Sequence, residues 1–143
     1  MRAAVLLLLL GASLSAACAD APRLRLTIAG VAISAEVVET PQARARGLMH
    51  RKQLPKDEGM LFIFPHSDYH AMWMQDTFVP LSVAFIDASG VILNIEDMAP
   101  QTTSTHAAAA PAKFALEMNR GWFTAHGVKP GARIHDLPGA AHN

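Results

Sequence analysis

Three carboxylates are the main candidates for chemistry in this chain: Asp76, and Glu96 and Glu117 in strand-like segments. Glu117 interrupts an apolar run, and strand alternation turns its side chain away from those of Leu116 and Met118. Burying a carboxylate without a partner is costly. Glu117 is therefore expected to face water, to pair with an arginine or to belong to a site.

Two interpretations of this carboxylate stay open. Charged residues on half-exposed sheets usually face solvent or an ion-pair partner. Alternatively, Glu117 joins Asp76 and Glu96 in a polar pocket that binds a small ligand, with Arg51 or Arg44 as the countercharge. A glycosidase would need two carboxylates at a defined separation across the scissile bond, and the spacing along this chain specifies no such pair.

A second candidate site lies in the segment that contains His66, His70, Met72 and Met74. Imidazole and thioether ligands suit copper(I), and two methionines two residues apart point to the same side of a strand. Methionine is also a common filler of apolar cores. Copper binding is therefore one alternative for this segment, and core packing is the other.

Trp73 faces away from Met72 and Met74 if this segment is a strand. It then either packs into the opposite layer or forms an aromatic platform for a sugar or a peptide. Because large aromatic residues in strands are mostly core residues, we predict core packing for Trp73, while keeping it as a candidate ligand contact.

Composition and motifs exclude several function classes. Lysine plus arginine equals aspartate plus glutamate at 12 each, so the chain lacks the positive excess that nucleic-acid binding requires. No G-x-G-x-x-G loop cradles a phosphate and no G-x-S-x-G elbow presents a serine, so we expect no nucleotide cofactor and no serine hydrolase chemistry. The single cysteine excludes a disulfide framework.

The N-terminus has the features of a secretory signal: Arg2, an apolar stretch over residues 3–14 and small residues up to Ala19. Cleavage after Ala19 would remove a signal peptide of residues 1–19. Cleavage after residue 17 would instead leave Cys18 as the lipid-modified first residue of a lipoprotein. Both routes predict an exported bacterial protein, periplasmic or anchored to the outer envelope, whose only membrane contact would be a lipid at Cys18.

Hydrophobic periodicity predicts one β-rich domain over residues 20–137, followed by a frayed tail over residues 138–143. We expect hairpins at 24–39 and 81–96, a short helix at 41–46 capped by Thr40, a buried strand at 60–64, a long surface loop at 100–111, a strand at 113–119, a helical turn at 122–126 and a last strand at 134–137. The predicted fold is mainly β, at the margin of α+β, with about seven to eight short strands and one or two short helices in a compact β-sandwich or barrel.

Several motifs in order give a family resemblance: Gly47-Leu48-Met49-His50-Arg51, Gly59-Met60-Leu61-Phe62, Met72-Trp73-Met74-Gln75-Asp76-Thr77 and Leu116-Glu117. Read together, they resemble the bacterial and archaeal family known as domain of unknown function 192. The resemblance implies a compact, mainly β domain, frequently exported, and no established activity. The chain departs from the family pattern at Gln75-Asp76 and at Ser82, so a site built on those side chains would be altered here.

These observations together predict a non-catalytic binding domain of the cell envelope. Its partner would be a small polar ligand or another envelope protein, and we expect a monomer. The two alternatives are an enzyme that uses the carboxylates on cell-envelope glycans, and a periplasmic copper-binding protein.

Overall fold

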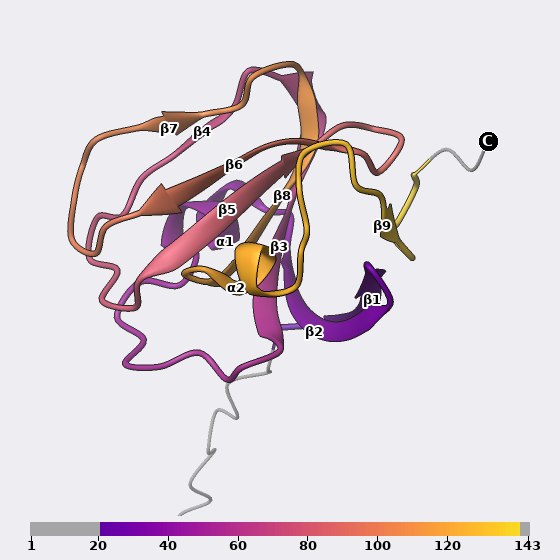
Figure 1. The fold of residues 1–143 in the computed structure, drawn as a ribbon. Helices are drawn as coiled ribbons and strands as arrows, with labels where there is room; N and C mark the ends of the chain where they lie inside the picture. Colours follow the sequence, from indigo (N-terminus) through magenta and orange to yellow (C-terminus); the bar gives the residue numbers. More distant parts are fainter. Residues whose placement is uncertain (1–20, 141–143) are drawn as a thin grey trace, which may run out of the picture.

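The computed structural model describes residues 21–140, drawn in colour in Figure 1. The predicted signal peptide, its cleavage site, Cys18 and residues 141–143 of the tail lie outside this range. Among the described residues, no helix combines the length and the apolar character that crossing a bilayer requires.

A seven-stranded sheet forms the body of the domain, with the strand order β6-β5-β8-β3-β2-β1-β9. Its strands are β1 (Arg23–Ile28), β2 (Val31–Val38), β3 (Glu58–Asp68), β5 (Leu81–Ile86), β6 (Ile92–Met98), β8 (Ala112–Asn119) and β9 (Ile134–His135). Two further strands, β4 (Ala71–Met72) and β7 (His106–Ala107), pair with each other, and the helices are α1 (Pro41–Arg46) and α2 (Trp122–Ala125). The predicted mainly β fold and both predicted hairpins are confirmed.

The main sheet curls until its two edges approach each other (Figure 1). The segment leading into β9 bonds to the start of β6: Ile92 N donates to Ala132 O at 2.9 Å, and Gly131 N donates to Ile92 O at 2.8 Å. A bridge between Val91 and Arg133 continues this contact. Of the two predicted architectures, the structure therefore has the barrel-like one.

Helix α1 lies in the crossover between the neighbouring parallel strands β2 and β3. The Thr40 hydroxyl accepts a hydrogen bond from Ala43 N at 3.1 Å, and Pro41 occupies the first turn, as the sequence predicts. The helix ends at Arg46 and is followed by Gly47, whose φ of 47° and ψ of −131° lie outside the left-handed helical region. Glycine suits this position because a Cβ there would lie 3.2 Å from Cζ of Phe62.

Apolar side chains form two cores, one on each face of the curled sheet. The first contains Leu26, Ile28, Leu61, Phe114, Leu116, Met118 and the α2 residues Trp122 and Phe123. The second contains Val38, Leu48, Met60, Phe62, Phe64, Met74, Val83, Phe85 and Ala115. Because β8 contributes alternate residues to the two cores, the side chain of Glu117 points into the second core, next to that of Ala115.

The segment predicted as a long loop, residues 100–111, is tied to the chain beside it. Its strand β7 pairs with β4, and Met74 N and Ala108 N form hydrogen bonds of 3.0 and 2.8 Å to Thr102 O and His70 O. The loop prediction is therefore partly wrong. The segment has no hydrophobic alternation because these backbone bonds, together with the buried side chain of Ala108, hold it in place.

Candidate functional site

Glu117 lies at the centre of the sheet, in strand β8. It is paired with Met60 of β3 on one side and with Val83 of β5 on the other, and the residue is only 4% exposed. No group among residues 21–140 donates a hydrogen bond to its carboxyl group or forms an ion pair with it. Burial among apolar neighbours raises the pKa of Glu117 to about 8.

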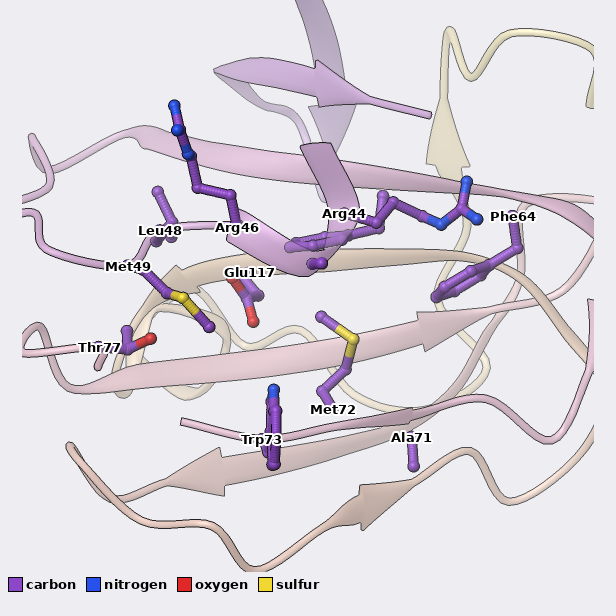
Figure 2. Close-up of a pocket in the computed structure, with 13 residues that line it drawn as sticks. Arg44, Arg46, Leu48, Met49, Phe64, Ala71, Met72, Trp73, Thr77 and Glu117 are labelled. Atoms are coloured by element: carbon purple, nitrogen blue, oxygen red, sulfur yellow. The ribbon is translucent and has the colours of Figure 1, made fainter. Parts of the chain in front are cut away.

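The carboxyl group of Glu117 points into a cavity of about 220 Å³. Figure 2 shows the side chains of Met49 and Met72 directed toward the same space, with the ring of Trp73 beside it. The other walls come from α1, the turn after it and strand β3: Arg44, Ala45, Arg46, Gly47, Leu48, Phe62 and Phe64, together with Ala71 and Thr77. The cavity thus has apolar, thioether and aromatic walls and one acid.

Two arginines line the cavity with their stems and direct their charges elsewhere (Figure 2). The Arg44 guanidinium donates to the carbonyl groups of Glu39 and Ile63, the latter at 3.3 Å, and lies 5.9 Å from the ring centre of Phe64. The Arg46 guanidinium points away from the carboxyl group of Glu117. Neither arginine is therefore the countercharge that the sequence suggested for this acid.

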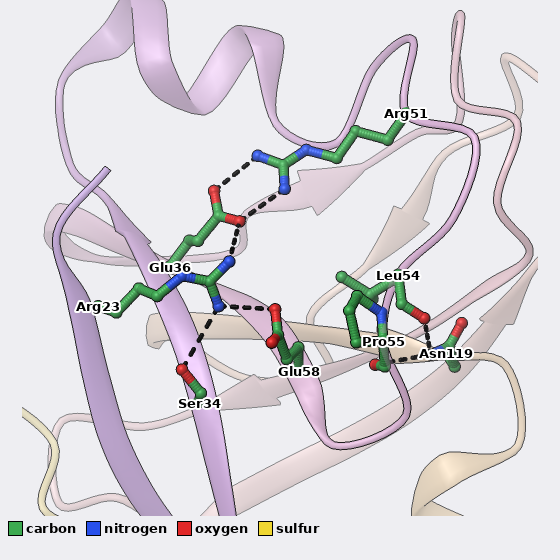
Figure 3. A network of polar contacts seen from close by, with 8 residues as sticks. All are labelled: Arg23, Ser34, Glu36, Arg51, Leu54, Pro55, Glu58 and Asn119. Carbon is green, nitrogen blue, oxygen red and sulfur yellow. Dashed lines mark hydrogen bonds and ion pairs between the residues drawn. The ribbon is translucent and has the colours of Figure 1, made fainter. Parts of the chain in front are cut away.

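Arg51, the other candidate countercharge, binds a different acid. Its guanidinium makes two bonds of 2.6 Å to the carboxylate of Glu36, and Arg23 adds a third at 2.9 Å (Figure 3). Arg23 also bridges to Glu58 at 2.7 Å. The hydrogen bonds from Arg51 hold the pKa of Glu36 below its usual value.

Figure 3 also shows Asn119, whose side-chain amide donates to the Leu54 and Pro55 carbonyls at 2.8 and 3.2 Å.

The other two carboxylates of the hypothesised pocket do not line the cavity. Asp76 is exposed in a turn with a φ of 50°. Glu96 is half-buried in β6, on the same face of the sheet as Glu117 but with Val83 of β5 between them. Two strand spacings put about 10 Å between their backbones. The three acids that the sequence grouped therefore do not converge.

The residues of the copper hypothesis are divided between different surroundings. Met74 is fully buried in the second core, whereas Met72 lines the cavity. His70 stacks on Phe64 with ring centres 3.7 Å apart, and His66 is exposed. In the described part of the chain, no group of three or more histidine, cysteine, aspartate or glutamate side chains could hold a metal ion together.

Trp73 is 47% exposed at the cavity, so the prediction of core packing is wrong for this residue. The alternation argument assumed a continuous strand, but β4 ends at Met72, and Trp73 leaves the sheet there. The structure brings together Trp73 and Glu117 from the ligand-pocket hypothesis and Met72 from the copper hypothesis. Met49 and Phe64 were missed, because their place in the site depends on how the α1 crossover folds over the sheet, which sequence periodicity does not show.

Comparisons with known proteins agree with this fold. The chain is similar to a candidate transcription regulator from Sinorhizobium meliloti 1021, at 35% identity over 79% of this chain and 91% of that one, with a TM-score of 0.74. It is also similar to a protein of unknown function from Novosphingobium aromaticivorans DSM 12444, at 28% identity over 82% and 88% of the two chains, with a TM-score of 0.77. No curated protein matches it. Residues 24–135 match DUF192, described as "Uncharacterized ACR", and the chain therefore belongs to the DUF192 family.

Proposed function

We propose that this domain binds a small ligand, or a side-chain-sized group of a larger partner, in the cavity at Glu117, without catalysing a reaction. The observation that supports this most is a residue that is almost fully buried, whose carboxyl group has no partner among the described residues and faces an open space. A buried acid without hydrogen bonds costs folding free energy, and an apolar residue would fill the position at lower cost. Residues that break this rule are commonly functional.

The size of the cavity limits the ligand. Pockets for drug-sized molecules and cofactors usually measure about 300 to 1,000 Å³, whereas this cavity measures about 220 Å³. A nucleotide or an oligosaccharide would exceed it. A group of a few heavy atoms, with an apolar stem along Met49 and Met72 and a polar end at Glu117, matches both its volume and its walls.

A binding role fits better than the glycan hydrolase alternative. Glycosidases use two carboxyl groups on either side of the scissile bond, at separations of about 5 to 9.5 Å. Within residues 21–140 the cavity is lined by one carboxyl group, that of Glu117. The copper alternative has no comparable support, because Met74 lies in the core away from the cavity wall and His70 packs on Phe64.

A DNA-binding role, suggested by the description of the Sinorhizobium meliloti relative, has little support in this chain. Its formal net charge is zero, and the longest helix in the described part, α1, has six residues. The signal-like N-terminus favours the cell envelope as the place of action. We therefore propose a binding domain that works outside the cytoplasm.

A fragment screen by NMR tests this function. Small amines, alcohols, amides and carboxylic acids would be added to the ¹⁵N-labelled domain, and the proposal expects shift changes at residues 44–49, 72, 73 and 117. The variant Glu117→Leu should lose these changes. Glu96→Leu is the matched control, because Glu96 lies on the same sheet face outside the cavity, and it should keep them. Shift changes scattered over the surface, or unaffected by Glu117→Leu, would contradict the proposal.

A further inference from the structure

We infer that the group bound in the cavity is a primary ammonium on a short apolar stem, and that it pairs with the carboxylate of Glu117. This inference rests on the proposed function and specifies its ligand. The ammonium could belong to a free alkylamine or to a lysine side chain of a peptide, because both have the same terminal chemistry.

The surroundings of Glu117 favour a cation over other polar groups. No donor among residues 21–140 bonds its carboxyl oxygens, so the protein itself provides nothing that stabilises the ionised acid. The ionised carboxylate of Glu117 would repel an anionic ligand. A neutral ligand would give this carboxylate no countercharge. An ammonium provides both a positive charge and N–H donors.

The walls add to this preference. The thioethers of Met49 and Met72 and the exposed ring of Trp73 flank the space in front of the carboxyl group (Figure 2). The face of an indole attracts cations most strongly among the aromatic side chains, and a thioether sulfur is a weak hydrogen-bond acceptor. Arg44 and Arg46, the two arginines that line the cavity, direct their charges away from Glu117. The stems of these arginines add apolar wall without placing a charge in the way.

The volume sets the length of the stem. About 220 Å³ holds an alkyl chain of a few carbons together with its ammonium, and little more. The four-carbon stem of a lysine side chain, or n-butylamine, is of this size. The guanidinium of an arginine side chain is larger and planar, and it would meet only one acid in the cavity, so it could not be paired on both of its edges.

Binding of an ammonium must also release a proton. With a pKa of about 8, Glu117 is mostly protonated at pH 7. The ion pair requires the ionised acid, while an alkylammonium keeps its own proton throughout this pH range. The apparent affinity should therefore rise about tenfold from pH 6 to pH 7 and only about twofold from pH 8 to pH 9.

The test is calorimetric titration of the domain with n-butylamine, 1-butanol and butyrate at pH 6, 7, 8 and 9, in buffers of different ionisation enthalpy. The expected result is that the amine binds, the alcohol and the acid bind at least tenfold more weakly, and close to one proton is released for each amine bound at pH 7. Equal binding of 1-butanol, or an amine affinity that does not change with pH, would overturn the ammonium assignment.

Two variants connect the result to the residue. Glu117→Gln keeps the shape of the neutral acid but cannot ionise, so it should lose the amine and the proton release while remaining folded. Glu96→Gln, outside the cavity, should behave like the unmodified protein. Retained amine binding by Glu117→Gln would overturn the assignment. If the alcohol or the acid binds at Glu117 and the amine does not, the ammonium class is wrong but the proposed pocket stands.

A lysine peptide distinguishes the two sources. N-acetyl-lysine methylamide has the same terminal ammonium as butylamine, with a peptide backbone attached. Binding at least tenfold tighter than that of butylamine would identify a protein partner as the source, and weaker binding would identify a free amine. In either case, Glu117→Gln should lose the binding of butylamine and the binding of the lysine peptide to the same extent. A peptide that binds Glu117→Gln as well as it binds the unmodified protein would contradict the inference.

Discussion

Glu36 and Glu117 lie on the same face of the sheet and are separated by one residue, Met60, which is paired with both. The two acids are buried to nearly the same extent, with 6% and 4% of each residue exposed. Arg51 and Arg23 reach Glu36, but neither bonds to Glu117. The pKa is consequently lowered at one acid and raised at the other. The arginines that reach Glu36 outweigh the effect of its burial, whereas at Glu117 burial acts alone because no arginine reaches it.

The first prediction concerns the pH dependence of stability. An acid with a raised pKa binds more protons in the folded state than in the unfolded state, so the free energy of unfolding falls as the pH rises between the two pKa values. For Glu117 this window runs from the ordinary value of 4.5 to about 8. The loss across the window has an upper limit of about 5 kcal/mol. Urea denaturation at pH 5, 6, 7, 8 and 9 should show the decline.

The control for this prediction is Glu117→Gln, which has no proton to lose. Its free energy of unfolding should stay nearly level from pH 5 to pH 8 and exceed that of the unmodified protein at pH 9. Glu96→Gln should keep the decline. A decline of the same size in Glu117→Gln would assign the pH effect to another group.

The second prediction concerns the ion pairs of Glu36. Replacing Glu36 by Gln removes charge-assisted bonds from Arg51 and Arg23, and we expect a loss of about 2 kcal/mol, reduced from the fully buried case because both arginines are partly exposed. Glu58→Gln is the comparison, since it breaks only the more exposed bridge to Arg23 and should cost about 0.5 kcal/mol. Thermal and urea denaturation at pH 7 measure both losses.

The pH dependence of this second effect has the opposite sign. The pKa of Glu36 is lowered, so its contribution to stability is present above the ordinary value of 4.5 and is lost as the pH falls through the lower folded value. The difference between Glu36→Gln and the unmodified protein should therefore shrink in strong acid. A difference that is the same at pH 7 and at pH 3 would contradict the ion-pair explanation.

The third prediction separates the two tryptophans. Trp73 is 47% exposed, so Trp73→Leu should change the free energy of unfolding by about 0.5 kcal/mol or less. Trp122 is 4% exposed and donates from Nε1 to Asp57 at 3.0 Å, so Trp122→Leu should cost about 3 kcal/mol. Iodide should quench the fluorescence of Trp73 and spare that of Trp122. A large loss of stability in Trp73→Leu would show that Trp73 packs in the core.

Much of the fold could be predicted because its signals are local. The β1–β2 and β5–β6 hairpins follow from period-2 alternation around turn residues, and the start of α1 follows from Thr40 and Pro41. Alternation along β8 also predicted that Glu117 faces away from Leu116. These features depend on residues within a few positions of each other. Their side-chain types are therefore enough to predict the local backbone conformation.

The site could not be predicted in the same way, because it depends on strands far apart in the sequence. Whether the face of β8 that contains Glu117 meets water or a second core depends on the α1 crossover, which brings Leu48 and Met49 over the sheet. The pairing of Met60 with both Glu36 and Glu117 is a matter of register between β2, β3 and β8. The sequence therefore suggested Arg51 as a countercharge for Glu117, whereas Arg51 binds Glu36.

The fourth prediction tests the pairing of β3 with β8. Gly59 of β3 is paired with Met118, and a Cβ at Gly59 would lie 2.4 Å from both the backbone oxygen of Glu117 and Sδ of Met118. The sulfur belongs to a flexible side chain, but the backbone oxygen cannot move without shifting the strand. Gly59→Ala should therefore cost about 3 kcal/mol and displace the residue that the proposed ligand contacts.

The matched comparison is Gly127→Ala, where no atom lies within 4 Å of the added methyl group and only the positive φ of 67° is unfavourable. That substitution should cost about 1 kcal/mol and leave amine binding unchanged. In ¹⁵N spectra, Gly59→Ala should shift the amide signals of residues 116–118, whereas Gly127→Ala should not. Equal losses of stability in the two variants, or an unperturbed β8 in Gly59→Ala, would show that β3 and β8 have more room at Glu117 than the close approach of Gly59 implies.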